Sequence, residues 1–207
     1  MVKTSKAIFT FGTDKKCNQV KYLSANLKNW KVGKNKIPGF FAGGCAIEVK
    51  SKQEIWLIGG AGKYNKRILI FDLETHTFTE LPVKLNVGRY CHKCIITKIG
   101  NSEVILVTGG IEEKIPSCEY LNSVEIINIE TGTVTLSSPM IIKRAAHGIG
   151  TLNIKNQPRI VISGGINNSG TRSKKSIEIF DEETLKWELL DDITMNEAKD
   201  DFGYLAI

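Results

Sequence analysis

The chain has 207 residues, of which 42% are hydrophobic and 24% charged, so its composition predicts a soluble domain, or two small ones, with a sizeable core. No apolar run approaches the roughly 20 residues of a membrane-spanning helix, and the start has no signal-peptide cleavage site. Five cysteines are an odd number, which argues against a disulfide framework and favours the cytoplasm. The net charge of +6 comes from scattered lysines rather than a dense basic block, so we do not expect nucleic-acid binding.

Four apolar runs that end in glycine mark an internal repeat. In chain order they are AIFTFG at 7–12, IWLIGG at 55–60, VILVTGG at 104–110 and RIVISGG at 159–165. The last three end in a glycine pair, and the final glycines recur about every 50 residues. Their alternation and β-branched content predict strands.

A second run follows each glycine. These runs are VKYLS at 20–24, ILIFD at 68–72, VEIIN at 124–128 and IEIFD at 177–181. Turn-like residues separate each run from a large apolar residue, which predicts hairpins with that residue on the next strand. We expect these residues to be buried between sheets: Trp30, Phe78, Val134 and Trp187.

One more strand completes each unit. The candidates are GGCAIEV at 43–49, HKCIITK at 92–98, HGIGTLN at 147–153 and FGYLAI at 202–207. In this interpretation the chain begins on the second strand of its first sheet, and 202–207 supplies the innermost strand by pairing with 7–12. Units of four strands in about 50 residues are typical of β-propeller blades, which bury their faces against one another.

The pattern of apolar run, double glycine, Val-Glu-Ile-Phe-Asp-like strand and tryptophan resembles the Kelch repeat. It extends from about residue 7 to the end, although the first copy has one glycine and the third has Val134 at the aromatic position. The resemblance implies an all-β propeller of four blades in a single domain, 1–207, closed by the C-terminal strand. The blade segments are 7–32 with 202–207, 41–81, 91–137 and 146–190. Kelch propellers more often have five to seven blades, so a fragment of a larger ring is the alternative.

The same resemblance implies a protein-interaction module that has no cofactor. In Kelch-like adaptors of ubiquitin ligases, arginines in the loops on one rim bind acidic peptides, and arginine suits carboxylates because its planar fork bonds both oxygens. Arg89, Arg144 and Lys199 share one repeat position. An equally good interpretation is that both arginines pair with neighbouring loop carbonyls or acids. The predicted partner-binding residues are Arg89, Arg144, Lys199, Lys63, Tyr64, Lys66, Arg172 and Lys174.

Residues with catalytic or metal-binding chemistry are few. His92 and His147 occupy equivalent repeat positions, which favours a structural role, and His76 lies in a hairpin where we expect it to be exposed. Cys91 and Cys94 have metal-site spacing, but a zinc site needs four ligands and no second pair exists. The rival hypothesis is a small-molecule enzyme (an isomerase, lyase or oxidase) with its site over the central channel.

Overall fold

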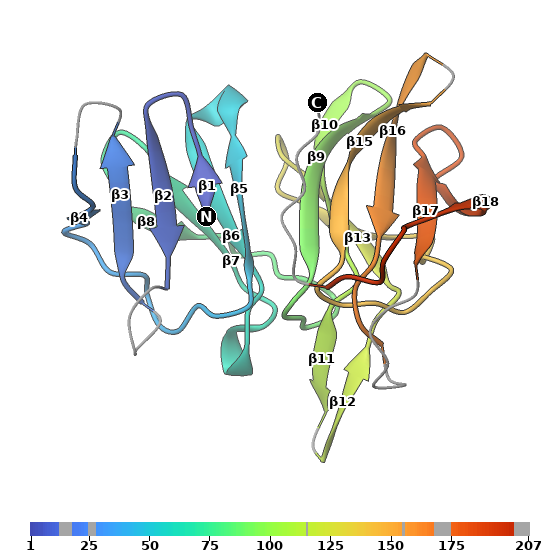
Figure 1. Ribbon diagram of the computed structural model, residues 1–207. Coiled ribbons are helices and arrows are strands. Elements are labelled where there is room, and N and C mark those ends of the chain that lie inside the picture. Colours follow the sequence, from blue (N-terminus) through green and yellow to red (C-terminus); the bar gives the residue numbers. More distant parts are fainter. Residues whose placement is uncertain (13–17, 25–27, 115, 155, 168–174, 201–207) are drawn as a thin grey trace. The chain divides into compact units, whose positions relative to one another are not determined.

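The computed structural model describes residues 1–12, 18–24, 28–114, 116–154, 156–167 and 175–200 (Figure 1). The chain divides into two compact units, Met1–Tyr90 and Cys91–Ile207. Apart from two short 3-10 turns, η1 (Lys50–Lys52) and η2 (Gly62–Tyr64), the regular structure of the described residues is β-strand. The all-β prediction is therefore confirmed. Within the same residues, no helix has the length and apolar character needed to cross a membrane.

The first unit contains two four-stranded antiparallel sheets, each with its strands in sequence order. The first sheet is built from β1 (Val2–Lys3), β2 (Ala7–Phe11), β3 (Val20–Ser24) and β4 (Lys31–Val32). The second sheet is built from β5 (Cys45–Val49), β6 (Glu54–Ile58), β7 (Ile68–Asp72) and β8 (Phe78–Glu80).

The start of the first sheet differs from the prediction. The chain does not begin on the second strand, because β1 pairs with β2 through Val2 opposite Phe9 and Lys3 opposite Ile8. The short turn at residues 4–6, in which the Thr4 hydroxyl donates to the Ala7 carbonyl at 3.0 Å, makes this local pairing possible. Residues 202–207, which were expected to pair there, lie outside the described residues.

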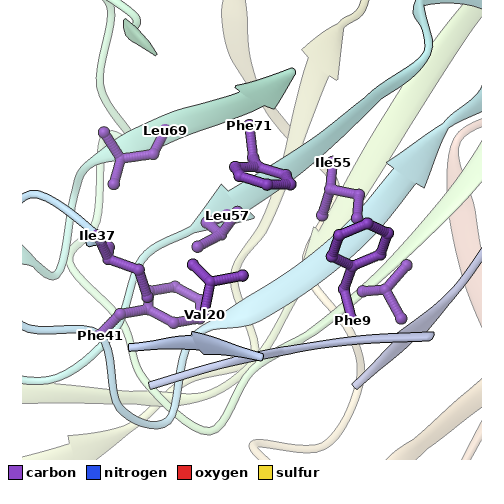
Figure 2. Packing of buried hydrophobic residues seen from close by; sticks show 9 residues of the cluster. Phe9, Val20, Ile37, Phe41, Ile55, Leu57, Leu69 and Phe71 are labelled. Carbon is purple, nitrogen blue, oxygen red and sulfur yellow. The ribbon is translucent and has the colours of Figure 1, made fainter. Parts of the chain in front are cut away.

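Side chains from both sheets of the first unit form one apolar core (Figure 2). Alternation along β6 directs Ile55 and Leu57 to the same face, where Phe9 of β2 and Phe71 of β7 join them. His76 was expected to be exposed, but it is half-buried, with its ring centroid 5.4 Å from that of Phe71. The His76 side chain therefore packs against this core, whereas its neighbours Thr75 and Thr77 are exposed.

The second unit also contains two four-stranded antiparallel sheets. The third sheet is built from β9 (Lys93–Ile99), β10 (Ser102–Thr108), β13 (Val124–Asn128) and β14 (Val134–Ser137). The fourth sheet is built from β15 (Gly148–Ile154), β16 (Gln157–Ser163), β17 (Ser176–Asp181) and β18 (Lys186–Thr194). Leu106 and Val124 of the third sheet pack with Ile162 and Phe180 of the fourth.

A fifth, two-stranded sheet interrupts the third repeat. It is the hairpin of β11 (Ile111–Lys114) and β12 (Ser117–Tyr120), which extends from the end of β10 (Figure 1). The sequence does not predict this hairpin, because a charged segment such as Glu-Glu-Lys has no apolar alternation. Five sheets rather than four are present among the described residues, so the closed four-blade ring and the single domain remain predictions.

The two tryptophans that were expected to be buried have different environments. Trp187 is 8% exposed, and its ring centroid lies 4.8 Å from that of Phe180. Trp30 is 44% exposed, so the expectation for it was wrong. It precedes β4, a strand of two exposed residues, and the core of this unit is instead filled by phenylalanines from β2 and β7.

Candidate functional site

One backbone contact recurs at the glycine-rich end of three sheets. The amide of Gly60 donates to the Arg89 carbonyl at 3.0 Å, that of Gly110 to the Arg144 carbonyl at 2.9 Å, and that of Gly165 to the Lys199 carbonyl at 2.9 Å. The equivalence of Arg89, Arg144 and Lys199 in the repeat is therefore real. Each contact joins the loop after the second strand to the loop that follows the fourth strand.

The backbone torsion angles and the lack of space for a Cβ atom both require glycine at these positions. Gly109 and Gly165 have φ values of +59° and +94°, a region that other residues enter only with strain. A Cβ atom at Gly165 would lie 2.6 Å from the Ala145 carbonyl oxygen and 2.9 Å from the Cβ of His147. At Gly109 it would collide with the Arg144 carbonyl oxygen. The glycine pairs thus allow close approach of the neighbouring loop.

Arg144 lies inside the second unit, with 1% of its side chain exposed. Its guanidinium donates to the Gly164 carbonyl at 2.8 Å, the Ser176 hydroxyl at 3.2 Å and Oε1 of Glu178 at 2.6 Å. Burial lowers the pKa of Arg144, and the carboxylate of Glu178 opposes that shift. This geometry matches the interpretation in which the arginine pairs with loop carbonyls and an acid.

Glu178 on β17 is the partner that sequence reasoning missed. Its side chain is fully buried and also accepts hydrogen bonds from the backbone amides of Ile141, at 2.6 Å, and Ile142, at 3.2 Å. A glutamate in the middle of the apolar run IEIFD was the available signal, because a buried carboxylate needs charged or hydrogen-bonding partners. Glu178 therefore fixes the loop between β14 and β15 against the fourth sheet.

Arg89 is also buried, with no exposed side-chain surface. Its Nε donates to the Val87 carbonyl at 3.4 Å, and its backbone amide donates to the Asn65 carbonyl at 3.0 Å. The structure thus places the side chains of Arg89 and Arg144 in the interior, whereas the predicted role in binding an acidic peptide needs them on a surface. Their backbone carbonyls hold the glycine-rich loops instead.

The two equivalent histidines are buried as well. His147 is fully buried, and its Nε2 lies 2.9 Å from Oγ1 of Thr108 on β10. Burial, together with the charges of Arg144 and Lys93, lowers the pKa of His147 well below 6.5, so the ring stays neutral at pH 7. His92 is 3% exposed. A neutral, buried imidazole that contacts a threonine hydroxyl joins the fourth sheet to the third.

The exposed lysines of the predicted site are divided between loops of the first unit and a loop of the second unit. In the first unit, the predicted residues Lys63 and Lys66 line a groove of about 350 Å³ together with Lys84, which was not predicted. Nζ of Lys66 donates to the Asn86 carbonyl at 2.8 Å. In the second unit, Lys199 is 58% exposed and lies 3.6 Å from Glu197. The side chain of Tyr64 and residues Arg172 and Lys174 lie outside what the structure describes.

The β11–β12 hairpin is attached to the neighbouring loop by exposed charges. Oε2 of Glu119 lies 2.6 Å from Nζ of Lys114, and its Oε1 lies 2.9 Å from Nζ of Lys143. Hydrogen bonds from the two ammonium groups, Lys114 first, lower the pKa of Glu119 to about 2. The hairpin and the Lys143 loop therefore form one charged surface at the glycine-rich end of the third sheet.

Cys91 and Cys94, the two cysteines considered as metal ligands, form no disulfide bond in the structure. Across the described ranges, no group of three His, Cys, Asp or Glu side chains has an arrangement that could hold a metal ion. Cys91 has a positive φ of 52°, as does the equivalent Ala146, and its carbonyl accepts the Ala146 amide at 2.8 Å. The segment thus has a backbone role before the first strand of the third and of the fourth sheet.

Comparison with known proteins gives a distant relative. The chain matches no protein-family model. It is 28% identical over 193 residues to a RING finger domain and kelch repeat-containing protein of Dictyostelium discoideum. The match covers 93% of this chain and 18% of the length of that protein. The kelch repeats of this relative and the repeated antiparallel sheets found here fit a kelch-like fold.

Proposed function

We propose that this chain is a protein-interaction domain whose four-stranded sheets are blades of a Kelch-type propeller. The observation that carries the proposal is the recurring hydrogen bond from the second glycine of each pair to the carbonyl of Arg89, Arg144 or Lys199. It fixes two loops at the same end of each sheet. Rigid elements that present paired loops are a common way to build a binding surface.

The chemistry of the exposed loop residues favours an acidic partner segment. Lys63, Lys66 and Lys84 surround one groove, in which Glu80 is the acidic lining residue. Exposed ammonium groups attract carboxylates and speed encounter, and this attraction weakens as salt rises. The net charge of +6 acts in the same direction.

The wider assembly is also part of the proposal. The relative combines kelch repeats with a RING finger, and we infer that this chain serves as the recognition part of a ubiquitin-ligase-type assembly in the cytoplasm. A small-molecule enzyme with a site over a central channel is the alternative function, and it too requires the four sheets to close into a ring.

The test compares two triple variants that change the net charge equally. Lys63→Glu/Lys66→Glu/Lys84→Glu reverses the charge of the groove. The matched control reverses three exposed lysines on strands β4, β9 and β18: Lys31, Lys98 and Lys186. The immobilised full chain captures proteins from a cell lysate at low and high salt, and mass spectrometry quantifies them.

We expect one acidic partner to be retained by the wild-type chain and by the strand variant. The groove variant should lose it by more than about tenfold. Thermal unfolding curves of both variants check that each remains folded. Equal retention by the groove variant at every salt concentration would contradict the acidic-partner proposal.

A further inference from the structure

A second, larger cavity of about 840 Å³ lies within the first unit, at the other end of the second sheet. Gly59 and Gly60 follow β6, whereas the cavity is lined by Gln53, which precedes β6, and by His76 in the turn after β7. Its volume is within the range of pockets that bury most of a small ligand, roughly 300–1,000 Å³. The proposed protein-binding loops take no part in it.

Aromatic rings form one wall of this cavity. The ring centroid of Tyr22 lies 5.4 Å from that of His76 and 5.8 Å from that of Phe9. Phe9 is 3% exposed and anchors the wall in the apolar core, whereas Tyr22 and His76 are half-buried (Figure 2 shows Phe9 in that core). The planes of the Tyr22 and His76 rings are inclined by 72°. A planar ring can therefore stack on the face of one of them and contact the edge of the other.

Two residues of the cavity have a backbone conformation that favours glycine. Gln53 has a φ of 56° and His76 a φ of 57°. The equivalent turns of the third sheet have Gly100 and Gly132, and a Cβ atom at either would meet nothing within 4 Å. For a residue other than glycine this conformation is strained. Both strained positions of the second sheet therefore carry side chains, and these line the cavity. The third sheet has glycines, and so no side chains, at the equivalent positions.

The residue equivalent to His76 in the fourth sheet shows which side chain suits this turn when packing is its only role. Leu185 has a φ of 56° and packs against the apolar core of the second unit. Leucine therefore fits this turn when the side chain only fills space. An imidazole at the same position adds hydrogen-bonding atoms to the wall of an open cavity, where filling space does not require them.

The charge around the cavity is mostly positive. Lys3, Lys6 and Lys50 line it and are exposed, and Glu48 is the acidic lining residue. Exposed ammonium groups beside an aromatic wall suit a ligand that carries its negative charge at the edge of a ring. Ser5 and Ser24, which also line the cavity, supply hydroxyl groups.

We propose that this cavity binds a small aromatic anion, in which a planar ring system is linked to a phosphate group. The ring lies against Tyr22 and His76, and the anionic group lies among Lys3, Lys6 and Lys50. This site is independent of the protein-binding loops, so either can be wrong without the other.

Calorimetric titration of the full chain with four probes tests the proposal. Adenosine monophosphate and phenyl phosphate combine a ring with a phosphate, whereas adenosine and inorganic phosphate each lack one part. We expect at least one of the two combined probes to bind about tenfold more tightly than either partial probe. A preference between the combined probes distinguishes a nucleotide from a simple aryl phosphate.

Variants locate the binding in the cavity. Lys3→Glu/Lys6→Glu should weaken binding of the preferred probe by more than about tenfold, and His76→Leu by about fivefold, although leucine preserves the packing. The control Lys31→Glu/Lys98→Glu should change binding by less than about twofold. The proposal is overturned if no combined probe binds better than inorganic phosphate, or if His76→Leu and the lysine pair bind as well as the wild type.

Discussion

Two clusters of the second unit each contain an ion pair and differ in their contact with water. The loop clasp consists of Gly109, Arg144, His147 and Glu178, all buried. The hairpin brace consists of Lys114, Glu119 and Lys143, whose side chains are 55%, 37% and 47% exposed. Arg144 and Lys143 are consecutive residues, and both form ion pairs with N–O distances under 3 Å.

Burial gives these similar contacts different consequences. In the loop clasp a broken pair leaves a charge without solvent, so each member depends on the others. In the hairpin brace water replaces a lost partner at little cost. The buried cluster therefore sets the position of the loops, whereas the hairpin brace contributes little to it.

The largest effect should come from removing one member of the buried pair. Arg144→Ala leaves Glu178 buried with only two backbone amides, and we expect the free energy of unfolding to fall by about 3–5 kcal/mol. Urea denaturation measures it. The apolar double variant Arg144→Met/Glu178→Leu should recover much of the loss, and a loss from Arg144→Ala no larger than that from Lys143→Ala would contradict the comparison.

Two glycine-to-alanine variants separate the cost of a steric clash from the cost of backbone strain. Gly109→Ala places a Cβ atom against the Arg144 carbonyl oxygen at a φ of +59°, and we expect a loss of more than about 2 kcal/mol. Gly132→Ala has a φ of +71° with nothing within 4 Å, so it should cost only about 1 kcal/mol. Equal melting temperatures for the two variants would show that the loop does not approach Gly109 closely.

Acid should weaken the loop clasp through His147. Its pKa in the folded protein is far below the ordinary 6.5, so the unfolded chain binds a proton that the folded chain excludes. The stability that follows from this lowered pKa is fully present above pH 6.5 and is lost as the pH falls below 6.5. We expect the free energy of unfolding to fall by roughly 1–2 kcal/mol from pH 7 to pH 5. In His147→Asn, denaturation curves at the two pH values should differ less; an unchanged difference would assign it to other groups.

The smallest effect belongs to the hairpin brace. The pKa of Glu119 is about 2, so its contribution is complete above the ordinary 4.5 and is lost as pH falls through about 2. In an NMR titration, we expect Lys143→Ala or high salt to move this pKa towards 4.5, with a fall in unfolding temperature smaller than that caused by any of the variants above. A pKa near 4.5 in the wild-type chain at low salt would remove the brace from the account.

The sequence predicted the strands well, because the alternation of apolar residues and the glycines at the ends of strands are local signals. The runs VKYLS, ILIFD and VEIIN coincide with β3, β7 and β13 residue for residue. The first sheet was harder, since a two-residue strand such as β1 has no period to detect. The β11–β12 hairpin was missed for a similar reason, because its residues are mostly polar and half of them are exposed.

The side-chain roles were less predictable than the strands. Arg144 and Lys199 share a repeat position and a backbone contact, yet one side chain is buried and the other exposed. Burial of Arg144 depends on Glu178, more than 30 residues away in sequence, and a repeat pattern does not reveal such a partner. Local pattern therefore fixes the backbone, whereas side-chain exposure depends on distant residues.

Cross-linking of the captured partner with a lysine-reactive reagent tests the central claim most directly. If fixed loops present the binding surface, mass spectrometry should find partner cross-links at Lys63, Lys66 and Lys84. Cross-links concentrated instead at the strand residues Lys31, Lys98 and Lys186 would place the partner on the sheet surfaces and contradict the account.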